Sequence, residues 1–196
     1  MGSENSFYDI KVFVYFAGPD VFEPDWAARQ NIIKILCDDT LYFKGVKLVP
    51  LIPVDGAGKT AKEICEGNLA LIDKADAVVA NLSPFRGAEP DSGTVFEVSR
   101  AVAAGKIVVG YSSDLRPYPQ IVESFQGPVT KKADGMMYDS QNRFIENFGS
   151  PINLMLSQTM PELQKDIVGA LIEVAKEAVI RGRKAKDSPN KGREGR

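Results

Sequence analysis

Between residues 11 and 111 of this 196-residue chain, short apolar segments alternate with segments of helical periodicity, and this order limits the fold more than any other feature. The apolar segments are rich in β-branched and aromatic residues and are not interrupted by polar ones, which is typical of strands buried on both faces. Four strands are expected, over residues 11–16, 46–52, 76–82 and 106–111. Helices are expected over residues 24–37, 60–72 and 94–104. The pattern predicts an α/β fold in which helices cover both faces of a parallel sheet.

The rest of the chain adds less regular segments to this outline. Pro50 can give no hydrogen bond to a neighbouring strand, so the second strand is expected at an edge of the sheet. Residues 112–150 are polar and irregular, which favours a functional loop, and a last helix is expected over residues 161–181. We expect one domain over residues 10–181, between a disordered N-terminus, residues 1–9, and a basic disordered tail, residues 182–196.

Composition excludes several classes of function. The chain has no histidine, which removes Ser-His and Cys-His catalysis, and Cys37 and Cys65 are too few for a metal site or a disulfide framework, so both are expected to be buried. Residues 181–196 hold seven basic and two acidic residues, which leaves 17 basic and 24 acidic residues in the preceding part. An acidic body argues against a nucleic-acid partner. No stretch is apolar enough to span a membrane and no leader is recognisable, so we expect a cytoplasmic protein.

The segment Gly56-Ala-Gly-Lys-Thr60 is similar to part of a phosphate-binding loop, since it lies between a strand and a helix. The full motif needs a glycine five residues before Gly58, where this chain has Pro53. An ordinary loop with a threonine at the helix start is therefore favoured. No Gly-x-Gly-x-x-Gly sequence follows any strand either, and neither a cofactor nor a metal is expected.

Two carboxylates lie after the third strand, where ligands bind in sheets of this kind. Asp91 precedes the expected helix over residues 94–104, and Glu97 falls in its first turn. Thr94 and Glu97 have the spacing of a capping box, in which both side chains serve only to start the helix. Alternatively, the helix dipole keeps Glu97 ionised, and the pair is suited to attack on the electrophilic carbon of a sugar. Spacing alone favours neither of these two interpretations over the other.

Several ordered blocks between residues 10 and 157 resemble the nucleoside 2-deoxyribosyltransferase family. They are residues 16–22 (FAGPDVF), 75–81 (ADAVVAN), 91–97 (DSGTVFE), the Gly105-Lys106 start of the fourth strand, and residues 146–155 (ENFGSPINLM). The resemblance implies a flavodoxin-like parallel sheet of about five strands. It also implies a ping-pong reaction, in which a carboxylate takes the deoxyribosyl group from a 2′-deoxynucleoside and passes it to a second nucleobase.

The resemblance also assigns roles to individual residues. Glu97 matches the nucleophile, and Asp91 matches an acid that either holds the sugar or gives a proton to the base. Phe22 matches an aromatic that packs on the base, although it could instead belong to the core. The same blocks imply four further substrate-binding positions, Phe16, Gly18, Ser92 and Gly93.

The last matching block implies an oligomer, because Asn153 and Met155 would reach a neighbouring subunit's site. From spacing alone, Asn153 could equally be an exposed residue in a short helix. Asn68 stands where some members of the family carry an acid, and an amide cannot supply a proton at neutral pH. Two alternatives stay open: an N-glycosidase acting on deoxynucleoside 5′-monophosphates, with Ser92 and Arg86 near the phosphate, and a non-catalytic nucleotide-binding module.

Overall fold

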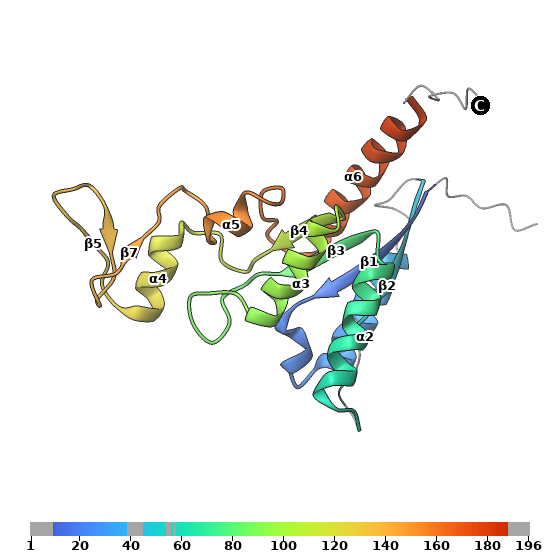
Figure 1. Cartoon of the computed structure of the whole chain (residues 1–196), viewed down its shortest axis with the longest axis horizontal. Coiled ribbons are helices and arrows are strands. Elements are labelled where there is room, and N and C mark those ends of the chain that lie inside the picture. The colour runs from blue at the N-terminus through green and yellow to red at the C-terminus, as the bar shows by residue number, and fades with distance from the viewer. Residues whose placement is uncertain (1–9, 39–44, 54–55, 57, 188–196) are drawn as a thin grey trace, which may run out of the picture.

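A parallel four-stranded sheet forms the centre of the molecule (Figure 1). The computed structural model describes residues 10–38, 45–53, 56 and 58–187. Its strands are β1 (Ile10–Ala17), β2 (Val46–Leu51), β3 (Ala77–Asn81) and β4 (Ile107–Tyr111), in the order β2-β1-β3-β4. The order reverses between β1 and β3, and such a switch point is where α/β sheets bind ligands. β2 is an edge strand, as Pro50 predicted.

The helices cover both faces of the sheet, which confirms the predicted flavodoxin-like architecture. α1 (Trp26–Asp38) and the C-terminal α6 (Ile167–Asp187) pack on one face, and α2 (Ala61–Lys74) and α3 (Ser92–Ala103) pack on the other. In β1 the side chains alternate between these two layers. Val12, Val14 and Phe16 join the core under α1 and α6, whereas Tyr15 and Ala17 join the core under α2 and α3.

The sheet has one strand fewer than predicted. Where a fifth strand would pair with β4, the described chain makes a single parallel bridge between Tyr111 and Gln164. Gln164 donates its backbone N–H to the Gly110 carbonyl and accepts from the Ser112 N–H, both at 3.0 Å. Because the chain turns into α6 three residues later, this pairing does not extend into a strand.

Residues 112–150 are more regular than predicted. They contain α4 (Tyr118–Gln126) and a small antiparallel sheet of three two-residue strands, β5 (Thr130–Lys131), β6 (Met137–Tyr138) and β7 (Phe144–Ile145). This part lies at one end of the molecule; the chain enters it from β4 and returns to the main body through the short helix α5 (Leu154–Ser157) (Figure 1). Strands of two residues are too short to show the alternation that sequence patterns depend on.

The bounds of α6 differ from the predicted 161–181. The helix begins after Asp166, whose Oδ1 accepts from the Gly169 N–H at 2.8 Å, and it runs to Asp187. The first residues of the predicted tail are thus helical, while residues 188–196 and the predicted disordered residues 1–9 lie outside the described part.

None of the helices in the described part has the length and apolar character needed to cross a membrane. Cys37 is buried as predicted, but Cys65 is exposed on α2.

Candidate active site

A cavity of about 570 Å³ opens beyond the carboxyl end of β1, on the face of the sheet covered by α2 and α3. It brings together six of the residues proposed from the sequence: Gly18, Phe22, Asn68, Asp91, Gly93 and Glu97. Its remaining walls are largely apolar and include Val21, Trp26, Pro53 and Ile64. An apolar cavity with a few convergent polar groups is typical of a small-molecule site.

Glu97 lies in the second turn of α3, because the helix begins at Ser92 rather than at Thr94. Its carboxylate accepts a hydrogen bond of 2.7 Å from the hydroxyl of Tyr15 on β1. Tyr15 is completely buried, so this bond fixes the orientation of the carboxylate from the floor of the site. Tyr15 was not among the predicted site residues.

The electrostatics of this pair differ from the prediction that the helix dipole keeps Glu97 ionised. Burial raises the pKa of Glu97 to about 7, the hydrogen bond from Tyr15 opposes this rise, and the negative charge of Asp91 adds to it. Burial and the adjacent Glu97 raise the pKa of the Tyr15 phenol well above its usual value. Tyr15 therefore remains a donor, and Glu97 changes charge near neutral pH.

Asp91, not Thr94, caps α3. Asp91 Oδ2 accepts from the Thr94 backbone N–H at 2.9 Å and from the Thr94 hydroxyl at 3.0 Å. The capping-box interpretation of Thr94 and Glu97 is therefore wrong, because the Glu97 carboxylate bonds to Tyr15 and the cap of the helix lies at Asp91. A genuine capping box lies at α2, where Thr60 and Glu63 bond to each other's backbone N–H groups.

Phe22 stands at the rim of the cavity and is not part of the core, since 59% of it is exposed. Its ring stacks on that of Phe85, with centroids 5.7 Å apart and planes 17° from parallel. The Arg86 guanidinium carbon lies 5.3 Å from the Phe22 centroid and 4.7 Å from that of Phe85. A partner ring and a cation thus hold Phe22 in place while leaving much of it open to solvent.

Four predicted site residues lie outside this cavity. Phe16 is a correction: as the neighbour of Tyr15 on a strand it faces the opposite side of the sheet, toward α1 and α6. Ser92, Asn153 and Met155 line a separate cavity of about 620 Å³ beside α3. Asn153 caps α5 through the Met155 N–H and donates to Glu146 at 2.6 Å, and Met155 is 68% exposed. Within one chain, neither reaches the Glu97 cavity.

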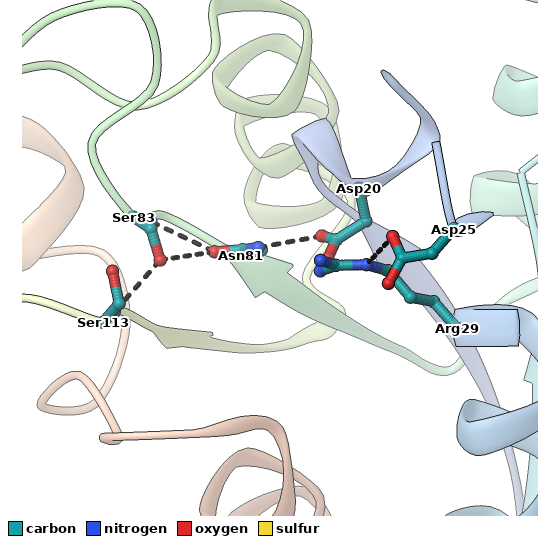
Figure 2. A network of polar contacts seen from close by, with 6 residues as sticks. All are labelled: Asp20, Asp25, Arg29, Asn81, Ser83 and Ser113. Atoms are coloured by element: carbon teal, nitrogen blue, oxygen red, sulfur yellow. Dashed lines mark hydrogen bonds and ion pairs between the residues drawn. The ribbon is translucent and has the colours of Figure 1, made fainter. Parts of the chain in front are cut away.

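A polar network lies behind the cavity, on the α1 face of the sheet (Figure 2). Asp20, in the 3₁₀ turn η1 (Pro19–Phe22), accepts from Asn81 Nδ2 at 2.8 Å and from Arg29 Nη1 at 2.9 Å. Asn81 Oδ1 accepts from the hydroxyl and the backbone N–H of Ser83. The Ser83 hydroxyl in turn accepts from the Ser113 N–H at 3.0 Å. The network ties the turn after β1 to the ends of β3 and β4.

Within the described ranges, no three histidine, cysteine, aspartate or glutamate side chains come together as metal ligands. Tyr15 is the functional residue that sequence reasoning missed. The sequence does contain a signal for it: successive side chains of a strand point to opposite faces, so only one of the neighbours Tyr15 and Phe16 can face α3. Periodicity alone could not say which face of β1 the carboxylates would approach.

Comparison with known proteins gives relatives of this chain in both sequence and structure. Residues 14–155 match the family model described as Nucleoside 2-deoxyribosyltransferase. The structure is similar to that of a 2-desoxiribosyltransferase from Leishmania mexicana, with a TM-score of 0.66 and 36% identity, covering 84% of this chain and 97% of that one. An uncharacterised protein from Schizosaccharomyces pombe is 30% identical, covering 72% of this chain and 74% of its own length. These findings confirm the resemblance read from the ordered blocks, and the chain belongs to the nucleoside 2-deoxyribosyltransferase family of enzymes.

Proposed function

We propose that this enzyme transfers the 2-deoxyribosyl group between nucleobases through a covalent deoxyribosyl ester on Glu97. The observation that carries the proposal is the Glu97 carboxylate itself, mostly buried in a cavity and aligned by the Tyr15 hydroxyl at 2.7 Å. Burial of an acid is costly to a fold, and a buried acid with a raised pKa that lines a cavity favours a chemical role. The neutral Tyr15 donor orients the carboxylate without removing its charge.

In the first half of the reaction, an ionised Glu97 oxygen forms a bond to C1′ of the deoxynucleoside. The C1′–N bond breaks, its electron pair passes to the base nitrogen, and the base leaves after gaining a proton. In the second half, a nitrogen of the incoming base attacks C1′, the ester bond breaks and Glu97 regains its charge, while the incoming nitrogen loses its proton. Two inversions at C1′ give overall retention.

Asp91 is proposed to hold the sugar rather than to supply the proton. Its Oδ2 already accepts from two Thr94 donors, which fixes the orientation of a side chain whose oxygens can accept from a sugar hydroxyl. Asn68 can hydrogen-bond the edge of a base but can transfer no proton. The proton on the departing base therefore comes from water in this proposal.

Phe22 is proposed to contact the base. Its exposed ring, supported by Phe85, offers a flat apolar surface at the rim of the cavity. Such a surface accepts several bases, since every nucleobase has a π-face. Gly18, Gly93 and Asn68 line the same cavity.

The enzyme is further proposed to act as a homo-oligomer in which Asn153 and Met155 complete a neighbouring subunit's site. Both residues lie away from their own Glu97 cavity, and the exposed Met155 follows the exposed Leu154, which lines a cavity together with the exposed Phe148. An exposed group of this kind is typical of a protein interface.

An exchange assay tests the function directly. Deoxyinosine and free cytosine are incubated with the protein, and formation of deoxycytidine is followed by chromatography. We expect exchange by the wild-type protein and a loss of at least about 10³-fold in Glu97→Ala, since a nucleophile is removed. Glu66→Ala, which removes an exposed glutamate from α2, is the matched control and should retain activity.

Two other results would point elsewhere. Release of deoxyribose without exchange would favour a hydrolase. In that case hydrolysis should be faster when a deoxynucleoside 5′-monophosphate is the substrate. Absence of both reactions over a panel of bases, with circular dichroism showing a folded protein, would contradict the proposal and favour a binding module.

A further inference from the structure

The Glu97 cavity shares a wall with a second cavity of about 610 Å³ on the opposite face of the sheet. Gly18, Val21 and Trp26 line both spaces. The shared wall is thus the turn after β1 and the start of α1, and Phe22, at the end of that turn, faces only the Glu97 cavity. Whatever fixes this turn also fixes the surface proposed to contact the base.

Asp20 is the centre of the bonds that fix the turn from behind (Figure 2). Its two carboxylate oxygens are used separately, Oδ2 by the Asn81 amide at 2.8 Å and Oδ1 by the Arg29 guanidinium at 2.9 Å. The Asp20 side chain is 18% exposed and that of Arg29 is 40% exposed, so both bonds are partly shielded from water. Shielded, charge-assisted bonds hold geometry more firmly than exposed ones.

The backbone is shaped to allow these contacts. A Cβ atom on Gly18 would lie 2.6 Å from Asp20 Oδ2 and 2.9 Å from Asn81 Cβ. Any side chain at this position would therefore separate Asp20 from Asn81. Gly18 serves the network as well as the open space of the cavity.

We infer that Asp20, Asn81 and Arg29 are positioning residues for the base-contacting wall, and that they set how well a nucleobase competes with water for the deoxyribosyl-enzyme. None of the three lines the Glu97 cavity, so they act on substrate only through Gly18, Val21 and Phe22. The inference rests on the proposed function, because it assigns a step to this wall.

The covalent intermediate can pass its deoxyribosyl group to a base or to water. Comparing these two reactions distinguishes a positioning role from a general structural one. Transfer requires an incoming base held against Phe22, whereas hydrolysis requires only water at C1′. A displaced wall therefore weakens base binding and transfer but leaves the attack of water unchanged. A destabilised protein instead loses both reactions together.

An amide–carboxylate exchange provides the test. Asn81→Asp places two carboxylates face to face and should raise the KM for the acceptor base about tenfold or more, with hydrolysis of the intermediate changed less than about twofold. In the double variant Asp20→Asn/Asn81→Asp, the amide and carboxylate are reversed. The carboxylate now at position 81 still accepts from Ser83, and the amide oxygen now at position 20 still accepts from Arg29, so the KM should return to near the wild-type value. Asp25→Asn is the control, since it removes the negative charge of the second partner of Arg29 without touching Asn81.

Base affinity is measured independently of the reaction from the fluorescence of Trp26, the only tryptophan of the chain. Adenine and cytosine are titrated into each variant, and we expect Asn81→Asp to weaken binding and the double variant to restore it. Unchanged affinity and an unchanged ratio of transfer to hydrolysis in Asn81→Asp would overturn the inference, as would failure of the double variant to recover. If the wild-type protein binds bases but neither transfers nor hydrolyses, the proposed function fails, and the affinity series alone decides the positioning role.

Discussion

Glu97 combines three properties in one side chain: it is mostly buried, it accepts a bond from a phenol that stays neutral, and its pKa is raised to about 7. With this pKa the carboxylate is divided between two protonation states near neutrality. In the proposed reaction the ionised state attacks C1′, and keeping that state in the cavity lowers the stability of the folded protein.

This cost predicts a pH-dependent stabilisation by Glu97→Gln. An ordinary glutamate titrates near 4.5, whereas the folded value is about 7, so the folded state binds the proton more tightly and is favoured at low pH. The favourable contribution is complete below about pH 4.5 and is lost as the pH rises through 7. Glutamine stays neutral throughout, so the variant should exceed the wild-type protein by roughly 3 kcal/mol at pH 8 and match it near pH 4.5.

Urea unfolding at several pH values measures this difference. Glu66→Gln, an exposed glutamate on α2, should show no comparable pH dependence. A stability gap between Glu97→Gln and wild type that stays constant from pH 4.5 to pH 8 would show that the pKa of Glu97 is not raised.

At the scale of elements, Asp91 combines the observed cap of α3 with a proposed role in the reaction. Asp91 starts the helix through Thr94 and also lines the cavity that holds Glu97. The two functions can be separated by substitution, because asparagine caps helices about as well as aspartate, whereas alanine does not.

We therefore predict different stabilities but similar activities for two variants of Asp91. Asp91→Ala should lower the free energy of unfolding by about 1 kcal/mol through loss of the cap, while Asp91→Asn should change it by only a few tenths. Both should lose most exchange activity, since neither offers a carboxylate to the sugar. Thermal unfolding and the exchange assay measure the two effects, and full activity in Asp91→Asn would show that Asp91 serves α3 alone.

The main elements were predictable because their signals are local. Every strand of the main sheet ends within a residue or so of its expected bounds, since runs of β-branched residues mark buried strands clearly. The observed N-terminus of α3 differs from the predicted one because Asp91 and Thr94 are both good caps, and only the fold selects between them. The two-residue strands β5, β6 and β7 carry no pattern at all.

The two carboxylates of the site could be predicted from the sequence, but Tyr15, which lies beneath them, could not. Asp91 and Glu97 follow a strand's carboxyl end, which places them at the switch point on topology alone. Choosing Tyr15 over Phe16 requires knowing which face of β1 lies under α3, and this depends on packing between segments more than 80 residues apart. The pKa of Glu97 likewise follows from burial, which no local pattern reports.

For the whole molecule, a shared active site predicts complementation between inactive variants. If Asn153 completes the neighbour's site, a mixed dimer of Glu97→Ala and Asn153→Ala chains contains one site with both residues intact. Random reassembly of equal amounts should then restore about a quarter of the wild-type exchange activity. Each variant alone should remain far below this level.

The measurement uses chains unfolded together, refolded and assayed, with size-exclusion chromatography to determine the assembly. Separately refolded variants mixed without exchange of subunits are the control. Activity that equals the sum of the two separate variants would mean that each chain builds its site alone.

The order β2-β1-β3-β4 also has a consequence for local opening of the molecule. β1 and β3 are each paired on both sides, whereas in the described part β2 and β4 have one strand partner, and β4 gains only the Tyr111–Gln164 bridge beyond it. Fluctuations that detach backbone segments should therefore begin at the two borders and reach the centre last. Tyr15 lies on β1 in that centre, so openings at the borders should leave its hydrogen bond to Glu97 in place.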